Sequence, residues 1–389
     1  MHNPFLFGKI VTGEHFCNRK KEKRLLEQNL MAGQSMVIIS PRRMGKSSLL
    51  AVVRQDLEAR GMLCGSVDLL ALKSVSKIVN EIIRVCAEMM LKDESNIKRF
   101  LKLSTDVFKR TRIAIEPSSN GVGFSVKPEI SLPVNVRMDL SEALNGLDDF
   151  LEKKGRKGVI IFHEFQEILT LDRLGEHPLE AEFRTVMQSI KNVAFAFLGS
   201  KASILSEMFR DTKRPFFQAA KILELGPIKE KSLSAYIAER FETAGITVES
   251  ADKIPGLVYG HPDYAQRLCS HIFDIISAEI GRESVLHMQD KYLIQGIHQM
   301  IEACSLMFIP EWEGYPLRQQ QVLSLLADHG PLKRIPAILL AEYDMSNSTF
   351  NSAVKQLVKK GTVKLNNELQ YEVADPIFGK WIVGDKPVR

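Results

Sequence analysis

Gly45, Lys46 and Ser47 form a triplet whose chemistry suits the binding of phosphate groups. A glycine lets the backbone approach phosphate oxygens, the amides at a helix N-terminus point toward them, and a lysine adds positive charge. The serine hydroxyl is a ligand for Mg²⁺. The flanking residues of the same loop are Pro41, Arg42, Arg43, Met44 and Ser48. The segment predicts a loop that binds a nucleotide together with Mg²⁺, with Lys46 also acting in catalysis.

An apolar run precedes the triplet and a helical pattern follows it, which is the order that a phosphate-binding loop requires. The run covers residues 36–40 and ends in Ser40, where the common G-x-x-x-x-G-K-S motif has its first glycine. The alternative is a chance G-K-S sequence after a strand. Because strand, loop and helix occur in the expected order, the phosphate loop is the favoured interpretation.

A second apolar run, residues 158–162, ends in the polar pair His163 and Glu164. In P-loop proteins the corresponding strand carries an aspartate that holds Mg²⁺, and a neighbouring glutamate orients the attacking water. Glu164 is therefore our candidate catalytic base. His163 occupies the aspartate position, and a neutral imidazole is a poor substitute for a carboxylate around Mg²⁺. The alternative is that both residues only end a buried strand, so hydrolysis stays open.

A third apolar run, residues 194–198, is followed by Gly199 and Ser200. If its strand lies beside the first one, Ser200 contacts the γ-phosphate or the attacking water. The alternative is a turn without a function. Further along, Arg210 and Arg214 lie in a basic segment, where an arginine is either a surface residue or reaches a phosphate bound by a neighbouring subunit.

Short apolar runs alternate with helical patterns up to residue 225, which predicts an α/β fold with a parallel sheet and helices on both faces. The runs are continuous, as in strands that are buried on both faces. The expected strands are residues 36–40, 63–68, 158–162, 193–199 and 222–225. Residues 92–137 interrupt this pattern with the basic segment 109–112 and a Gly, Ser and Pro-rich stretch of some β character. We expect an insertion there.

Helical patterns dominate the rest of the chain, and two prolines and a glycine in residues 310–316 predict a linker. Three helices and a hairpin then follow in the order of a winged helix-turn-helix. Their expected ranges are 317–328, 335–343 and 347–360 for the helices, and 362–364 and 369–373 for the strands. Ser346 and Gly361 are suitable caps for the third helix. The predicted domains are 1–228, 229–309 and 310–389.

One face of that third helix carries Asn347, Asn351, Lys355 and Lys359 at a spacing of four residues. Asparagine and lysine are residue types that contact base edges and phosphates, so the face is a candidate for DNA binding. Acidic residues in the same region offset much of its positive charge. Winged helices also dock proteins, and both kinds of partner stay open.

The composition is that of a globular protein, and it limits the kinds of protein that the chain can be. The chain has 389 residues, a formal charge of +5 and five widely spaced cysteines. Its length predicts two or three domains. No C-x-x-C pair, signal peptide or long apolar segment is evident, which predicts a cytoplasmic protein that does not span a membrane. The mildly basic charge permits nucleic acid as a partner without requiring it.

Several segments together resemble the archaeal and bacterial ATPases of the AAA+ and STAND group of P-loop NTPases. They are residues 16–22, SPRRMGKSSLL, FHEFQEIL, FLGSKASILSEMF, 214–217, 225–228, 260–262 and 374–381. The resemblance implies a P-loop ATPase domain, a helical lid and a winged helix, with ATP and Mg²⁺ as ligands. It also implies that Arg19 lies near the adenine and that His261 and Pro262 place the lid over the nucleotide.

Two functions are compatible with these features. The first is a nucleotide-dependent switch, in which ATP binding, with or without hydrolysis, repositions a winged helix that binds DNA or protein. The second is a DNA-binding regulator or scaffold that ATP stabilises with negligible turnover. The sequence excludes neither GTP nor an oligomer.

Overall fold

The computed structural model describes residues 2–93, 100, 111–117, 124–130, 135–172, 179–248, 250–279 and 286–384. The chain forms two units, each of which is described by itself. The first, here the sheet unit, consists of Lys20–Ser40 and Leu49–Leu225. The second, here the helical unit, consists of Met1–Arg19, Pro41–Ser48 and Gly226–Arg389. None of the helices in the described ranges is long and apolar enough to cross a membrane.

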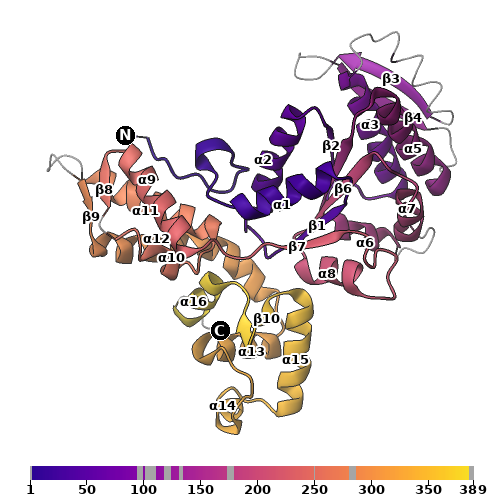
Figure 1. The fold of residues 1–389 in the computed structure, drawn as a ribbon. Helices are drawn as coiled ribbons and strands as arrows, with labels where there is room; N and C mark the ends of the chain where they lie inside the picture. Colours follow the sequence, from indigo (N-terminus) through magenta and orange to yellow (C-terminus); the bar gives the residue numbers. More distant parts are fainter. Residues whose placement is uncertain are drawn as a thin grey trace. The chain divides into compact units, whose positions relative to one another are not determined.

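The sheet unit is built on a parallel sheet (Figure 1). In the described residues its strand order is β2-β5-β6-β1-β7. The strands are β1 (Met36–Ile39), β2 (Leu63–Asp68), β5 (Gly158–His163), β6 (Val193–Leu198) and β7 (Lys221–Glu224). The predicted α/β fold and its strands are thereby confirmed. Consecutive residues of β5, from Val159 to Phe162, are all buried, so both faces of the sheet are covered.

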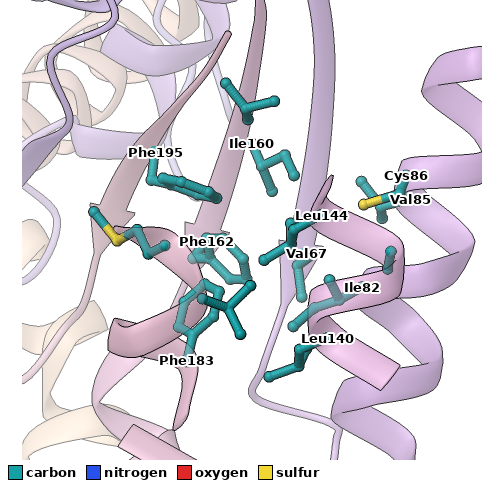
Figure 2. Packing of buried hydrophobic residues seen from close by; sticks show 14 of the residues in the cluster. Val67, Ile82, Val85, Cys86, Leu140, Leu144, Ile160, Phe162, Phe183 and Phe195 are labelled. Atoms are coloured by element: carbon teal, nitrogen blue, oxygen red, sulfur yellow. The ribbon is translucent and has the colours of Figure 1, made fainter. Parts of the chain in front are cut away.

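Helices cover this sheet, and Figure 2 shows how α3 (Val75–Asp93) and α5 (Val136–Lys154) pack apolar side chains against it. The other helices of the unit are α1 (Lys20–Met31), α2 (Lys46–Ala59), α6 (Ile168–Asp172), α7 (Leu179–Met187) and α8 (Ala202–Arg210). The predicted insertion contains an antiparallel hairpin, β3 (Thr111–Pro117) with β4 (Phe124–Ile130). Residues 109 and 110 of its basic segment lie outside the described residues.

Phenylalanine rings gather near the ends of β5 and β6. They belong to Phe162, Phe165, Phe183, Phe195, Phe197, Phe209 and Phe216, all of which are at most 1% exposed. The rings of Phe165 and Phe197 are 4.4 Å apart, which joins the segment after β5 to the neighbouring strand. Aromatic pairs at such distances add to the free energy of burial. The cluster therefore holds the ends of both strands in a fixed position.

The helical unit contains α9 (Glu230–Thr243), α10 (Ile254–Leu257), α11 (Pro262–Ala278) and α12 (Asp290–Glu313). The short strands β8 (Ile246–Val248) and β9 (Leu286–Met288) pair in parallel. The N-terminal segment packs on these helices, since the ring of Phe5 lies 4.6 Å from that of Phe241. Asn3 donates hydrogen bonds to Ser270 and Asp274 of α11. Nothing in the sequence predicted this association.

The predicted linker at residues 310–316 is wrong in its first part, because α12 continues through Pro310 to Glu313. A proline inside a helix removes one hydrogen bond, but burial of Phe308 and Trp312 on either side favours the helical conformation. The elements beyond it are α13 (Leu317–His329), α14 (Ala337–Glu342), α15 (Asn347–Lys360), β10 (Val363–Leu365), β11 (Tyr371–Val373) and α16 (Pro376–Gly384).

The caps predicted for α15 are confirmed. The Ser346 side chain accepts a hydrogen bond from the backbone N–H of Thr349. Gly361 ends the helix in a left-handed conformation, with φ of 79°. The element order is the predicted one, and the assignment as a winged helix stays a prediction. Helix α16, which we did not predict, follows the hairpin.

Replacement of Phe197 by Ala should destabilise the sheet unit, because it leaves a cavity at the centre of the phenylalanine cluster. We expect a loss of about 3–5 kcal/mol in the free energy of unfolding, measured by urea denaturation. Met138 on α5 is 53% exposed, and the control Met138→Ala should cost about 0.5 kcal/mol or less. Equal losses in the two variants would contradict the cluster's structural role.

Candidate functional site

The segment after β1 has the local geometry of a phosphate-binding loop. Helix α2 begins at Lys46, so the backbone amides of the loop lie at a helix N-terminus. Gly45 has φ of 85°, a conformation that favours glycine even though a Cβ here would meet no atom within 4 Å. Ser40 does not adopt a positive φ, so the backbone at this position does not require the glycine of the common motif. The Lys46 ammonium donates a hydrogen bond to the carbonyl of Pro41 at 2.8 Å.

Arg19 holds this loop through backbone carbonyls. Its side chain is only 6% exposed, and Nη2 donates to the carbonyl of Met44 at 3.3 Å and to that of Gly226 at 2.6 Å. Asn18 and Arg19 both have positive φ, which turns the chain sharply just before α1. The N-terminal segment contributes another contact, from the backbone N–H of Val11 to Oγ of Ser48 at 3.0 Å. Arg19 and the N-terminal segment therefore fix the position of the loop.

His261 caps α11 and contacts the same loop. Its Nδ1 accepts a hydrogen bond from the backbone N–H of Tyr264 at 3.4 Å, which assigns the ring proton to Nε2. Nε2 then donates to the carbonyl of Arg42 at 3.3 Å. Burial lowers the pKa of His261, against the opposing charges of Asp375 and Asp263, so the ring is neutral near pH 7. A neutral imidazole is what both hydrogen bonds require.

Gly260, which precedes His261, allows a close approach of two backbone segments. A Cβ on Gly260 would lie 2.5 Å from the carbonyl oxygen of Ile228, and φ is 66°. The carbonyl of Gly260 also accepts a hydrogen bond from the backbone N–H of Ile228 at 2.9 Å. The glycine is thus required by both its conformation and its surroundings.

A cavity of about 90 Å³ opens beside the loop within the helical unit. Its lining includes six of the residues predicted to bind the nucleotide, namely Arg19, Arg43, Met44, Gly45, Ser48 and Pro262. Pro41, Arg42, Lys46, Ser47 and His261 do not line it. Gln266 on α11 also lines it, as do residues of the N-terminal segment, namely Leu6, Phe7, Gly8, Lys9 and Val11. Sequence analysis missed these residues because no motif marks them.

The second group of predicted residues lies at the carboxyl ends of β5 and β6 in the sheet unit. Oε2 of Glu164 accepts hydrogen bonds from the backbone N–H of Ser200 at 3.1 Å and from its hydroxyl at 2.6 Å. Nε2 of Gln166 donates to the same oxygen at 2.7 Å. The structure therefore brings Glu164 and Ser200 together, and adds Gln166, which sequence analysis missed.

Gly199 makes room for this arrangement. A Cβ on Gly199 would lie 2.0 Å from Oε1 of Gln166, which is closer than any real contact. Gln166 is 2% exposed and has no space to move away. Glu164 itself has a positive φ of 52°, an uncommon conformation for a residue with a side chain. The glycine and the strained backbone together set the direction of the Glu164 carboxylate.

His163 ends β5, in register with Asp68 on β2. Burial lowers the pKa of His163 and Arg54 adds to this, whereas the charges of Asp68 and Glu164 oppose it. The imidazole is therefore neutral near pH 7 and does not repel a cation. In the ranges that the structure describes, no three His, Cys, Asp or Glu side chains gather as a metal site. The ligands of the predicted Mg²⁺ would be the Ser47 hydroxyl, nucleotide oxygens and water. Mg²⁺ in proteins usually has few protein ligands and keeps several waters.

Both arginines after β6 form ion pairs inside the sheet unit. Arg210 pairs with Glu224, and Arg214 pairs with Glu180 at 3.4 Å. The Glu180 side chain is 4% exposed, so loss of Arg214 would leave a buried carboxylate with less compensation. The predicted alternative was that one of these arginines reaches a phosphate bound by a neighbouring subunit. It is less favoured for Arg214, because Arg214 would have to break its ion pair with Glu180.

The four residues proposed for DNA binding, Asn347, Asn351, Lys355 and Lys359, are all exposed on α15. The opposite face of the helix is buried, with Phe350, Val354 and Leu357 in the core of the unit. The structure agrees with the predicted division of the helix into two faces. Their role in binding stays a prediction.

No protein-family model matches the sequence, and no curated protein matches it significantly. The structure is similar to the Walker-type ATPase PABY2304 of Pyrococcus abyssi, with a TM-score of 0.65 and 17% identity over 95% of this chain and 96% of that one. It is also similar to the Aeropyrum pernix ORC2 protein in its ADPNP–ADP complexes, with a TM-score of 0.57 and 15% identity over 97% and 96% of the two chains. The chain has the P-loop NTPase fold. These similarities support the predicted resemblance to archaeal AAA+ ATPases at the level of the fold.

The free energy of unfolding should fall as the pH is lowered through the range in which histidine titrates. The folded protein binds a proton at His261 less tightly than the unfolded chain, whose histidine has the ordinary pKa of 6.5. This contribution to stability is present above that value and declines below it. His261→Asn keeps an oxygen acceptor at the N-cap but cannot titrate, so its stability should fall less between about pH 7.5 and about pH 5.5 in urea denaturation. An equal fall in both proteins would contradict this assignment.

Proposed function

We propose that this chain binds ATP with Mg²⁺ at the phosphate loop and acts as a nucleotide-dependent switch. The observation that carries the proposal is the cavity beside the loop. It is lined by residues from separate parts of the sequence that were each predicted to bind a nucleotide. Arg19, Gly45 and Pro262 come from segments far apart in the chain, and the sequence predicts a role in nucleotide binding for each of them. Their convergence on one cavity supports a single ligand.

ATP is the proposed nucleotide and Ser47 the proposed protein ligand of Mg²⁺. The fold supports this choice, because one similar structure is a Walker-type ATPase and another was determined in ADPNP–ADP complexes. The loop residues of the site, Pro41–Ser48, belong to the helical unit, so nucleotide binding acts directly on that unit. ATP would favour the state of the unit that it contacts more extensively, since a ligand shifts an equilibrium only through differential affinity.

Hydrolysis is the second part of the proposal, with Glu164 as the base that orients water and Ser200 beside it. Strands β1, β5 and β6 are parallel neighbours within the sheet unit, so Ser40 after β1, Glu164 after β5 and Ser200 after β6 all follow the same edge of the sheet. In the described structure Ser200 and Gln166 occupy one oxygen of the Glu164 carboxylate. The reaction requires that carboxylate to accept a proton from water.

A binding module with negligible turnover is the alternative, and His163 is the observation that favours it. A neutral imidazole stands where a carboxylate would help to hold Mg²⁺.

In both proposals α15 of the predicted winged helix contacts DNA or a protein partner through its exposed asparagines and lysines. Free thiols on all five cysteines agree with a reducing compartment such as the cytoplasm.

Two variants separate binding from turnover. Lys46→Ala removes the positive charge near the phosphates, and ATP binding in equilibrium dialysis should be lost. Glu164→Gln keeps binding but should lower phosphate release, with or without duplex DNA, by about 100-fold or more. The matched control is Glu116→Gln on β3, where the exposed glutamate pairs with Lys127 at 3.3 Å; it should change the rate by less than about threefold. Turnover that survives in Glu164→Gln would remove Glu164 from the reaction.

His163→Asp tests what limits turnover. An aspartate restores an oxygen ligand at the end of β5, so phosphate release should rise at least about tenfold if positioning of Mg²⁺ is limiting. An unchanged rate in this variant, together with tight ATP binding and no turnover in the unmodified protein, would favour the binding module. GTP measured in parallel determines whether the site distinguishes the two bases.

A further inference from the structure

The C-terminal helix α16 starts at a carboxylate that is shared with a distant helix. Oδ1 of Asp375 accepts hydrogen bonds from the backbone N–H groups of Ile377 at 2.9 Å and Phe378 at 3.1 Å, which caps α16. Its other oxygen, Oδ2, accepts a hydrogen bond from the hydroxyl of Tyr264 on α11 at 2.5 Å. The two helices are thus joined by one side chain.

Tyr264 connects this carboxylate with the cap of α11. The tyrosine is 1% exposed, and its ring centroid lies 4.5 Å from that of His261. The backbone N–H of Tyr264 donates to His261, which in turn donates to the carbonyl of Arg42 in the phosphate loop. An unbroken series of contacts therefore leads from the loop to α16, and every residue in it belongs to the helical unit.

A parallel route passes through α12. Nη2 of Arg43 donates to Sδ of Met307 on that helix at 3.1 Å. One residue further along, Phe308 packs on Phe378 and Trp381 of α16, with ring centroids 5.1 Å and 5.7 Å apart. The indole N–H of Trp381 donates to Oγ of Ser305 on α12 at 2.8 Å. Arg42 and Arg43 are consecutive loop residues, so contacts through both α11 and α12 connect the loop with α16.

We propose that the Tyr264–Asp375 hydrogen bond is the joint through which occupancy of the phosphate loop is transmitted to α16 and the predicted winged helix. This inference rests on the proposed binding of nucleotide by the loop. Phosphates bound by the loop amides reposition the backbone at Arg42, and the cap of α11 moves with it. Tyr264 and Asp375 are positioning residues, which act through other groups without touching the nucleotide.

The chain contains its own reporter for this coupling. It has two tryptophans, Trp312 and Trp381, and both lie where α12 meets α16, with ring centroids 6.3 Å apart. Tryptophan emission therefore reports the packing in the region where α12 meets α16. Addition of Mg-ATP to the full-length protein should change this emission.

Tyr264→Phe removes the hydroxyl while the ring keeps its packing against His261. The variant should still bind radiolabelled ATP in equilibrium dialysis, but its nucleotide-dependent change in emission should be at least about twofold smaller. Tyr343→Phe is a matched control, because Tyr343 donates an equivalent hydrogen bond to Asp328 outside this series of contacts. The control should keep the full change.

Four results would overturn the proposal. The first is a full change in emission in Tyr264→Phe, and the second is ATP binding by the unmodified protein without any change. Absence of ATP binding in dialysis is the third, and it alone also refutes the proposed function. Asp375→Asn keeps an oxygen to cap α16 and should reproduce the effect of Tyr264→Phe. If neither Tyr264→Phe nor Asp375→Asn showed a cooperative thermal transition, the Tyr264–Asp375 hydrogen bond would be required for folding. Its proposed role in transmitting nucleotide occupancy would then be rejected.

Discussion

The buried guanidinium of Arg19 must find oxygen partners, and the arrangement around the phosphate loop depends on where it finds them. At 6% exposure it is stable only if its donors are satisfied, and it donates to the carbonyls of Met44 and Gly226. The loop and the segment that leaves the sheet are therefore fastened to the same side chain. The N-terminal segment that precedes Arg19 packs on the helical unit as well, through Phe5 and Asn3.

Uncommon backbone conformations surround this anchor. Asn18, Arg19 and Arg43 have positive φ, as does Gly45. Such residues cost free energy and persist only where surrounding contacts fix them. Here Arg19 and the contact between Val11 and Ser48 provide that support. The loop beside the cavity is therefore held by contacts to the carbonyl of Met44 and to the hydroxyl of Ser48.

At the carboxyl edge of the sheet, close packing fixes the position of the Glu164 carboxylate. The phenylalanine cluster fixes the ends of β5 and β6, and Gly199 admits Gln166 beside Glu164. Three donors then converge on one oxygen of the Glu164 carboxylate. His163 next to it stays neutral because burial lowers its pKa. The site thus keeps a directed carboxylate while it lacks the usual aspartate.

Local sequence determined the strands, the start of α2 at Lys46 and both caps of α15, because each depends on neighbours within a few residues. The same local signal was misleading at Pro310, where burial of flanking aromatic side chains outweighed the loss of one hydrogen bond. Only the tertiary structure decided that the N-terminal segment lines the cavity and that Tyr264 meets Asp375. Such contacts join segments with no shared motif, since they arise from the packing of whole helices and from buried polar groups that must find partners wherever the fold supplies them.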